Sequence, residues 1–177
     1  MRPLALGLAF LAAPVLADAV EAEKEAYTRD RAALEACTDA AADFESFMAC
    51  TRTTVEACRE RRPDGRSNAG GTACLYDELR IWTELYQQEV AGILRWAQDF
   101  DSDASRLRAS WGRAHETVLR AEVSWAEYVR DQCNMENVGY AAGTAAASGQ
   151  AACRLRLHAE RVFHLRSLDD LRPRDER

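Results

Sequence analysis

Residues 75–100, LYDELRIWTELYQQEVAGILRWAQDF, decide the fold of this chain. Apolar side chains recur there every three or four positions, which is the spacing of one face of an α-helix. The members of this stripe are Leu75, Leu79, Trp82, Tyr86, Val90, Ile93, Ala97 and Phe100. Helix-spaced aromatic residues usually pack inward, so the stripe predicts a long helix with a buried aromatic face, and a ligand-binding aromatic face is the alternative.

A second helix of the same kind follows almost at once. Its stripe consists of Leu107, Trp111, Ala114, Val118, Ala121, Trp125, Tyr128 and Gln132. Only residues 101–105, DSDAS, separate the two stripes, and Ser102 or Asp103 is the expected N-cap of the second helix. Because so short a link leaves neighbouring helices antiparallel, the sequence predicts a long antiparallel helical hairpin.

Shorter helices, stapled by disulfides, are expected on both sides of this hairpin. Helical periodicity predicts them at residues 20–37, 43–61 and 152–168, the last with a buried face of Leu155, Ala159, Val162 and Leu165. No stretch alternates with a period of two, so no strand is predicted. The expected fold is a single all-α domain over residues 18–171, followed by a charged, frayed tail at residues 172–177.

Residues 1–17 have the three parts of a secretory signal. Arg2 gives the positive start, residues 4–11 give a short apolar run, and small residues at Val15 and Ala17 precede a cut before Asp18. The apolar run is shorter than the roughly 20 residues that span a bilayer. The sequence therefore predicts a cleaved signal peptide and a mature protein, residues 18–177, that is periplasmic or secreted.

None of the six cysteines lies in the predicted signal, so all would reach an oxidising compartment. Cys133 and Cys153 stand apart from the others and close a Gly/Ala/Ser-rich segment, which makes them the first expected pair. Cys50 and Cys58, on one predicted helix, would lie about 12 Å apart, too far to be bridged. Cys58–Cys74 across a turn-rich stretch and Cys37–Cys50 then follow, although Cys37–Cys74 with other partners remains an alternative.

No catalytic or metal-binding pattern is recognisable in the sequence. It has no C-x-x-C motif, and His158 and His164 lack the spacing that places two metal ligands on one helix face. Ser148 lacks the G-x-S-x-G context of a nucleophile elbow. Several carboxylates are interpreted as solvated helix faces, namely Glu84, Glu89, Asp99 and Asp101. We therefore expect a protein without enzyme activity, metal or cofactor.

The chain is acidic, with a net charge of −6. Loss of the predicted signal would remove the charge of Arg2 and no acidic residue, so the mature protein would be more acidic still. This balance disfavours a nucleic-acid surface and favours encounter with a basic partner. The local exception is the basic cluster Arg59, Arg61, Arg62 and Arg66. Cations there complement the C-terminal end of a helix dipole, and a dedicated anion site is the alternative.

Residues 125–133, WAEYVRDQC, bring Trp125, Tyr128, Arg130 and Cys133 together in one block. This block resembles that of the LprI-type lysozyme-inhibitor family, a group of small exported helical domains, with one residue inserted between the tyrosine and the arginine. The cysteine order over residues 37–74 is similar to that of the cysteine-richer members. Residues 82–86, WTELY, keep the Trp, Leu and Tyr of the next family block but lack its Asp and Asn.

The resemblance, over about residues 33–168, implies a periplasmic or secreted binding protein that inhibits lysozyme by occupying its cleft. Its partner would be a lysozyme or another basic envelope protein. Some members have a lipid-accepting cysteine after the signal, and because Asp18 stands at that place here, we expect no membrane anchor. The alternative is a structural or envelope-associated interaction protein without lysozyme activity.

The segment between Cys133 and Cys153, residues 134–152, is the loop that we nominate for the lysozyme cleft. A loop pinned at both ends would lose less entropy on binding than a free one. Its hydrogen-bonding side chains are Asn134, Asn137, Tyr140, Thr144, Ser148 and Gln150. The alternative is a solvent loop that only joins two helices.

Overall fold

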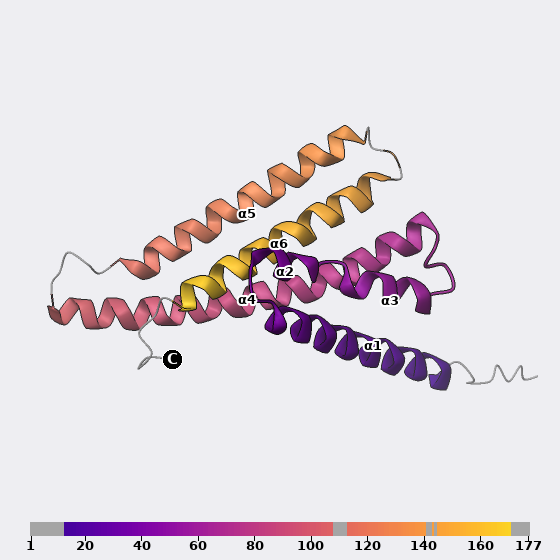
Figure 1. Ribbon diagram of the computed structural model, residues 1–177, viewed down its shortest axis with the longest axis horizontal. Helices are drawn as coiled ribbons and strands as arrows, with labels where there is room; N and C mark the ends of the chain where they lie inside the picture. Colours follow the sequence, from indigo (N-terminus) through magenta and orange to yellow (C-terminus); the bar gives the residue numbers. More distant parts are fainter. Residues whose placement is uncertain (1–12, 108–112, 141–142, 144, 171–177) are drawn as a thin grey trace, which may run out of the picture.

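The structure, a computed structural model, describes residues 13–107, 113–140, 143 and 145–170. Within these residues it contains six helices and no strand, which confirms the all-α class (Figure 1). The helices are α1 (Ala13–Ala40), α2 (Phe44–Ala49), α3 (Thr53–Arg61), α4 (Asn68–Leu107), α5 (Ala114–Gly139) and α6 (Ala145–Asp170). The predicted tail at residues 172–177 and most of the predicted signal lie outside the described residues.

Helices α4 and α5 form the predicted antiparallel hairpin (Figure 1). Helix α6 runs antiparallel to α5 and packs most extensively against α4. The remaining helices gather around this frame, since α3 packs against α4, α2 against α6, and α1 against α3. The molecule is thus a frame of α4, α5 and α6, with α1, α2 and α3 covering one part of it.

The core lies where α4 and α6 meet α1 and α2. Trp82 of α4 is fully buried against Phe47 of α2, and Leu34 of α1 is buried in the same cluster. The predicted stripe of α4 is confirmed at Leu75, Leu79, Trp82, Ile93 and Ala97, which are all buried, whereas Phe100 is exposed. The predicted face of α6 is confirmed in full, because Leu155, Ala159, Val162 and Leu165 are buried.

The buried face of α5 is rotated relative to the predicted stripe toward the C-terminal end of the helix, whereas Ala114, Val118 and Trp125 of that stripe are half-buried. Its buried residues are Val129 and Cys133, whereas Tyr128, expected in the core, is 53% exposed. Ala121 is exposed as well, and Trp111 lies outside the described residues. The rotation follows from Cys133, because its disulfide to Cys153 turns that side of α5 toward α6.

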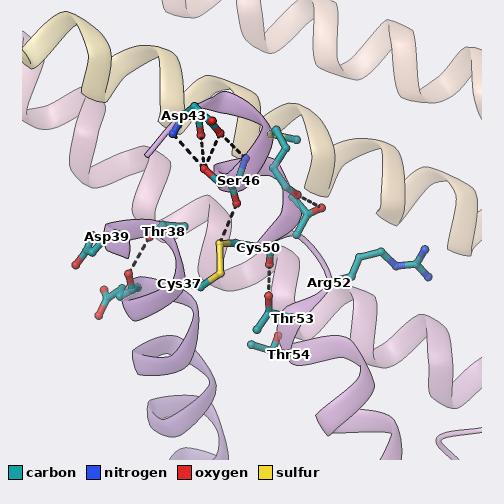
Figure 2. Close-up of a disulfide and its surroundings, with 12 residues drawn as sticks. Cys37, Thr38, Asp39, Asp43, Ser46, Cys50, Arg52, Thr53 and Thr54 are labelled. Atoms are coloured by element: carbon teal, nitrogen blue, oxygen red, sulfur yellow. Dashed lines mark hydrogen bonds between the residues drawn. A yellow bond between two sulfur atoms is a disulfide. The ribbon is translucent and has the colours of Figure 1, made fainter. Parts of the chain in front are cut away.

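Three disulfides join consecutive helices, and all three of the favoured pairings are confirmed. Cys37–Cys50 links α1 to the end of α2 (Figure 2), Cys58–Cys74 links α3 to α4, and Cys133–Cys153 links α5 to α6. The alternative that paired Cys37 with Cys74 is therefore wrong. Each disulfide joins the two helices of one pair. The three pairs are held to one another by packing and not by disulfides.

The single helix predicted over residues 43–61 is in fact two helices, α2 and α3. Arg52, between them, has a φ of 72°, a left-handed backbone conformation that residues other than glycine rarely adopt. The fully buried carboxylate of Glu78 accepts hydrogen bonds from the backbone N–H groups of Arg52, Thr54 and Val55. It therefore supplies the acceptors that the first turn of α3 lacks, which stabilises the break.

The link between α4 and α5 also differs from the prediction. Helix α4 continues to Leu107, so Ser102 and Asp103 lie inside it and do not cap α5. The cap comes from Asp101, whose carboxylate accepts hydrogen bonds from Ala114 N at 2.8 Å and His115 N at 3.0 Å. The Asp101 carboxylate, which the sequence analysis interprets as solvated, thus caps the first turn of α5.

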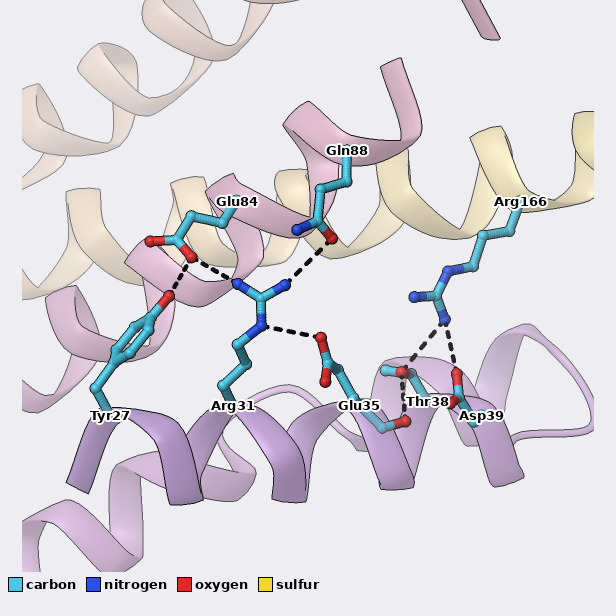
Figure 3. Close-up of polar contacts among 8 residues, drawn as sticks. All are labelled: Tyr27, Arg31, Glu35, Thr38, Asp39, Glu84, Gln88 and Arg166. Atoms are coloured by element: carbon cyan, nitrogen blue, oxygen red, sulfur yellow. Dashed lines mark hydrogen bonds and ion pairs between the residues drawn. The ribbon is translucent and has the colours of Figure 1, made fainter. Parts of the chain in front are cut away.

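Polar contacts attach α1 to the frame (Figure 3). Arg31 donates to Glu84 at 2.7 Å and to Gln88 at 3.2 Å, and Tyr27 donates to the same Glu84. Glu84 is therefore an interhelical anchor rather than a solvated face residue, and Glu89 accepts in the same way from Arg166 of α6. Helix α1 begins at Ala13, so the predicted cut before Asp18 falls within this helix.

Candidate functional site

The nominated binding segment, residues 134–152, is mostly helical rather than a long loop. Helix α5 continues to Gly139 and α6 begins at Ala145, so only a short connection separates them. Gly and Ala residues led to the loop prediction, but alanine is the strongest helix former and extends α6 toward its N-terminus. The expected mobile loop is therefore replaced by two helix ends tied by Cys133–Cys153.

The nominated polar side chains do not gather into one site. Asn134 and Gln150 hydrogen-bond to each other at 3.0 Å, which holds α5 to α6. Ser148 shares a hydrogen bond with Thr72 of α4. Asn137 lies on α5 and accepts a backbone bond from Tyr140 at 3.2 Å, and Thr144 lies outside the described residues. Four of the six thus lie on α5 or α6, where two of them bond to each other and one bonds to α4.

Tyr140 follows α5 and is half exposed. Its ring lies against Gly149 of α6, where a Cβ atom would come within 2.4 Å of the ring. Glycine at this position lets the aromatic ring pack directly on the α6 backbone. Tyr140 and Ser148 both line a pocket between the start of α6 and the start of α4.

The residues of the family-like block have different surroundings. Trp125 stacks on Tyr86 with ring centroids 4.5 Å apart, and Cys133 is buried in its disulfide. Tyr128 faces solvent, and Arg130 pairs with its exposed neighbour Asp131 at 2.8 Å. The block therefore contributes one core aromatic, one cross-link and two surface residues rather than a single site.

A polar cluster lies beneath Trp125. Glu122 of α5 accepts from Tyr86 at 2.8 Å and pairs with Arg161 of α6. Burial, together with the Glu122 carboxylate, raises the pKa of the Tyr86 hydroxyl well above its usual range. Burial lowers the pKa of His158, whose ring stands edge-on to Tyr86 and Trp125. These groups join α4, α5 and α6 and leave little of their surface for a ligand.

The outer side of α5 carries apolar side chains that face solvent. Tyr128, Met135 and Val138 are 53%, 62% and 78% exposed, respectively. At about 100° per residue they fall within about 80° of the helix circumference, away from the buried Val129 and Cys133. We call these three residues the α5 apolar surface. Exposed apolar side chains gathered in this way are typical of a protein-binding surface.

Charge surrounds the α5 apolar surface. The helix carries five acidic and two basic side chains. Asp131 lies between Tyr128 and Met135 in sequence, and the hydrogen bond from Arg130 lowers the pKa of its carboxyl. Asp131 is therefore ionised at neutral pH, and the surface presents apolar contacts beside the Arg130–Asp131 ion pair.

The sequence analysis does not find the α5 apolar surface, because it places Tyr128 in the core stripe and Met135 and Val138 in a loop. Had α5 been extended past Cys133, helical spacing would have placed Met135 and Val138 seven and ten residues from Tyr128. That spacing is the only signal in the sequence that marks them as one face. The exposure of the face follows from the rotation of α5 and not from composition.

Comparisons with family models, with curated proteins and with solved structures found no match for this chain. Among the described residues, no group of His, Cys, Asp and Glu side chains has an arrangement that could hold a metal ion. None of the described helices is both long and apolar enough to span a membrane. The candidate site therefore depends on the geometry of α5 and its neighbours.

Proposed function

We propose that this chain is an exported, disulfide-stabilised binding protein that inhibits a lysozyme by occupying its cleft, without catalysis of its own. The observation that carries the proposal is the α5 apolar surface, which stands exposed on a helix tied to α6 by Cys133–Cys153. An amphipathic helix that lays such a face into a groove is a common mode of recognition.

The anchoring of α5 supports binding because a rigid surface loses less entropy when a partner covers it. Beside the disulfide, Gln150 bonds to Asn134, and Arg161 bonds to Glu122. These contacts hold α5 to α6 and leave Tyr128, Met135 and Val138 exposed to a partner. The surface is therefore preorganised.

Charge supports a basic partner. The whole chain has a net charge of −6, and α5 itself has more acidic than basic side chains. Long-range attraction of this kind raises association rates with positively charged proteins and weakens with added salt. Three disulfides and the signal-like residues 1–17 agree with export to an oxidising compartment.

A lysis assay tests the proposal. Oxidised protein, residues 18–177, is added to bacterial cell walls with lysozymes of several classes, and turbidity is followed. Dose-dependent inhibition of at least one class, lost on reduction of the disulfides, is the expected result. If no class is inhibited, the lysozyme proposal is wrong, and a structural or envelope-associated interaction protein becomes the leading account.

A pair of neutral substitutions tests the α5 apolar surface itself. We expect Met135→Gln with Val138→Gln to weaken inhibition at least about tenfold, because each removes an apolar anchor without changing charge. The matched control is Leu119→Gln with Val123→Gln, since these exposed residues lie on another side of the same helix. Equal losses in both variants would show that this surface is not the specific contact.

A further inference from the structure

A basic pocket lies between the α2–α3 turn, the start of α4 and the start of α6. Its volume is about 310 Å³, and its walls include Arg52, Arg59 and Arg66. No aspartate or glutamate is among its lining residues. In a chain of net charge −6, a cavity lined by three arginines and no acid is a local reversal of charge.

Two of these arginines have no carboxylate partner. Neither Arg52 nor Arg66 forms an ion pair or a side-chain hydrogen bond with any of the described residues. In Figure 2 the Arg52 side chain extends away from the Cys37–Cys50 disulfide, and its guanidinium meets none of the residues drawn. Most other arginines of the described helices pair with acids, as Arg31, Arg61 and Arg161 do.

The third arginine is held in place by the backbone around it. The Arg59 guanidinium lies over Gly71 in the first turn of α4, where a Cβ atom would come within 2.8 Å of it. Glu56 accepts from Arg59 Nη1 at 3.0 Å, while Arg59 Nε is buried without an acceptor among the described residues. This guanidinium therefore has more donors than the protein has acceptors for it.

The backbone conformation at Arg52 is also unusual. A left-handed conformation is unfavourable for a residue with a side chain, whereas glycine adopts it without that cost. The chain nevertheless has arginine there, at a φ of 72°, and the buried Glu78 holds its N–H. Strain that surrounding structure maintains is typical of functional positions.

Other groups on the pocket wall suit an anion. Asn68 begins α4 and Ala145 begins α6, so the positive ends of two helix dipoles border the cavity. The hydroxyl groups of Thr72 and Ser148, which bond to each other, also line it. Two acids lie beside the pocket without lining it: Glu56 pairs with Arg59, and Glu136 lines an adjoining groove that Arg52 also lines.

We propose that this pocket binds a phosphate-type oxyanion, either a free anion or the phosphate group of a small molecule. Guanidinium groups donate paired hydrogen bonds to phosphate oxygens, and three of them can neutralise a doubly charged group. The basic cluster near Arg59, interpreted from sequence as a complement to a helix dipole, then has a second role through Arg59 and Arg66. The inference does not depend on lysozyme binding, because none of Tyr128, Met135 and Val138 lines the pocket.

Calorimetric titration of the oxidised protein in a phosphate-free buffer of low ionic strength tests the proposal. The probes are orthophosphate, pyrophosphate and glucose 1-phosphate, with glucose as the uncharged control. Binding of at least one phosphate probe, weakened by salt, is expected, and glucose should not bind. Tighter binding of glucose 1-phosphate than of orthophosphate would identify a phosphorylated small molecule as the occupant, and the reverse order would identify the free anion.

Two variants and a control locate the binding. We expect Arg66→Gln to weaken binding of the best probe at least about tenfold. Arg52→Gly should do the same without lowering the melting temperature, because glycine accepts the left-handed backbone. Arg95→Gln removes the same charge from an exposed position on α4 that does not line the pocket. Failure of every phosphate probe to bind at millimolar concentration, or equal weakening in all three variants, would overturn the proposal.

Discussion

At the scale of single residues, Glu78 organises more of the structure than any sequence pattern indicates. Its fully buried carboxylate accepts from the turn that contains Arg52, from the hydroxyl of Thr54 and from the indole of Trp82. A buried charge is stable only when hydrogen bonds compensate it, and here they come from two helices and a turn. Sequence alone could not show this, because an acid on a helix usually faces water.

Replacement of this carboxylate tests that role. Glu78→Gln keeps the shape of the side chain but turns an NH2 group toward backbone donors, so we expect the free energy of unfolding to fall by about 2–3 kcal/mol. Urea denaturation monitored by circular dichroism measures the change. Glu60→Gln, at an exposed position on α3, is the control and should change little. A loss below about 1 kcal/mol would contradict the assigned role of Glu78.

At the scale of elements, periodicity predicted α4 and α6 well and α5 poorly. The stripes of α4 and α6 are confirmed because each helix packs its apolar face on several neighbours, as Trp82 and Val162 show. Helix α5 packs mainly on α6 and α4, and its rotation is set by the Cys133 cross-link and by Glu122. Such long-range contacts leave no periodic trace in the sequence.

The predictions of element boundaries failed for a related reason. The ends of α5 and α6 around residues 134–152 and the break at Arg52 depend on tertiary partners such as Gly149 and Glu78. The Cys133–Cys153 disulfide, in contrast, could be predicted from its separation along the chain, and helix geometry excluded Cys50–Cys58. The choice between Cys37–Cys50 and Cys37–Cys74 needed the structure. The α5 apolar surface became visible only when the rotation of α5 was known.

The junction between α4 and α5 provides a test at this scale. Removal of the cap by Asp101→Ala leaves the N–H groups of Ala114 and His115 without acceptors, and we expect a loss of about 1 kcal/mol. Hydrogen exchange should become faster in the first turns of α5 before it changes in α4. Asp99→Ala, one exposed position on the same helix, is the control. Unchanged exchange in α5 would show that the cap is not needed.

At the scale of the whole molecule, three disulfides stabilise individual helix pairs, and the frame of α4, α5 and α6 holds the pairs to one another. The disulfides join α1 to α2, α3 to α4 and α5 to α6, while packing of α6 on α4 unites the three pairs. Core contacts therefore concentrate around α4 and α6, and α5 keeps one side exposed. The α5 apolar surface and the arginine pocket have no residue in common on this scaffold.

The measurement that tests the central claim most directly is hydrogen exchange of the oxidised protein with and without a saturating amount of lysozyme. We predict that bound lysozyme slows exchange over residues 128–138 of α5, because the partner covers Tyr128, Met135 and Val138 and suppresses opening of the helix. Exchange in α1 should stay the same. Unchanged exchange along α5 with every lysozyme class, or protection confined to α1–α3, would contradict the account.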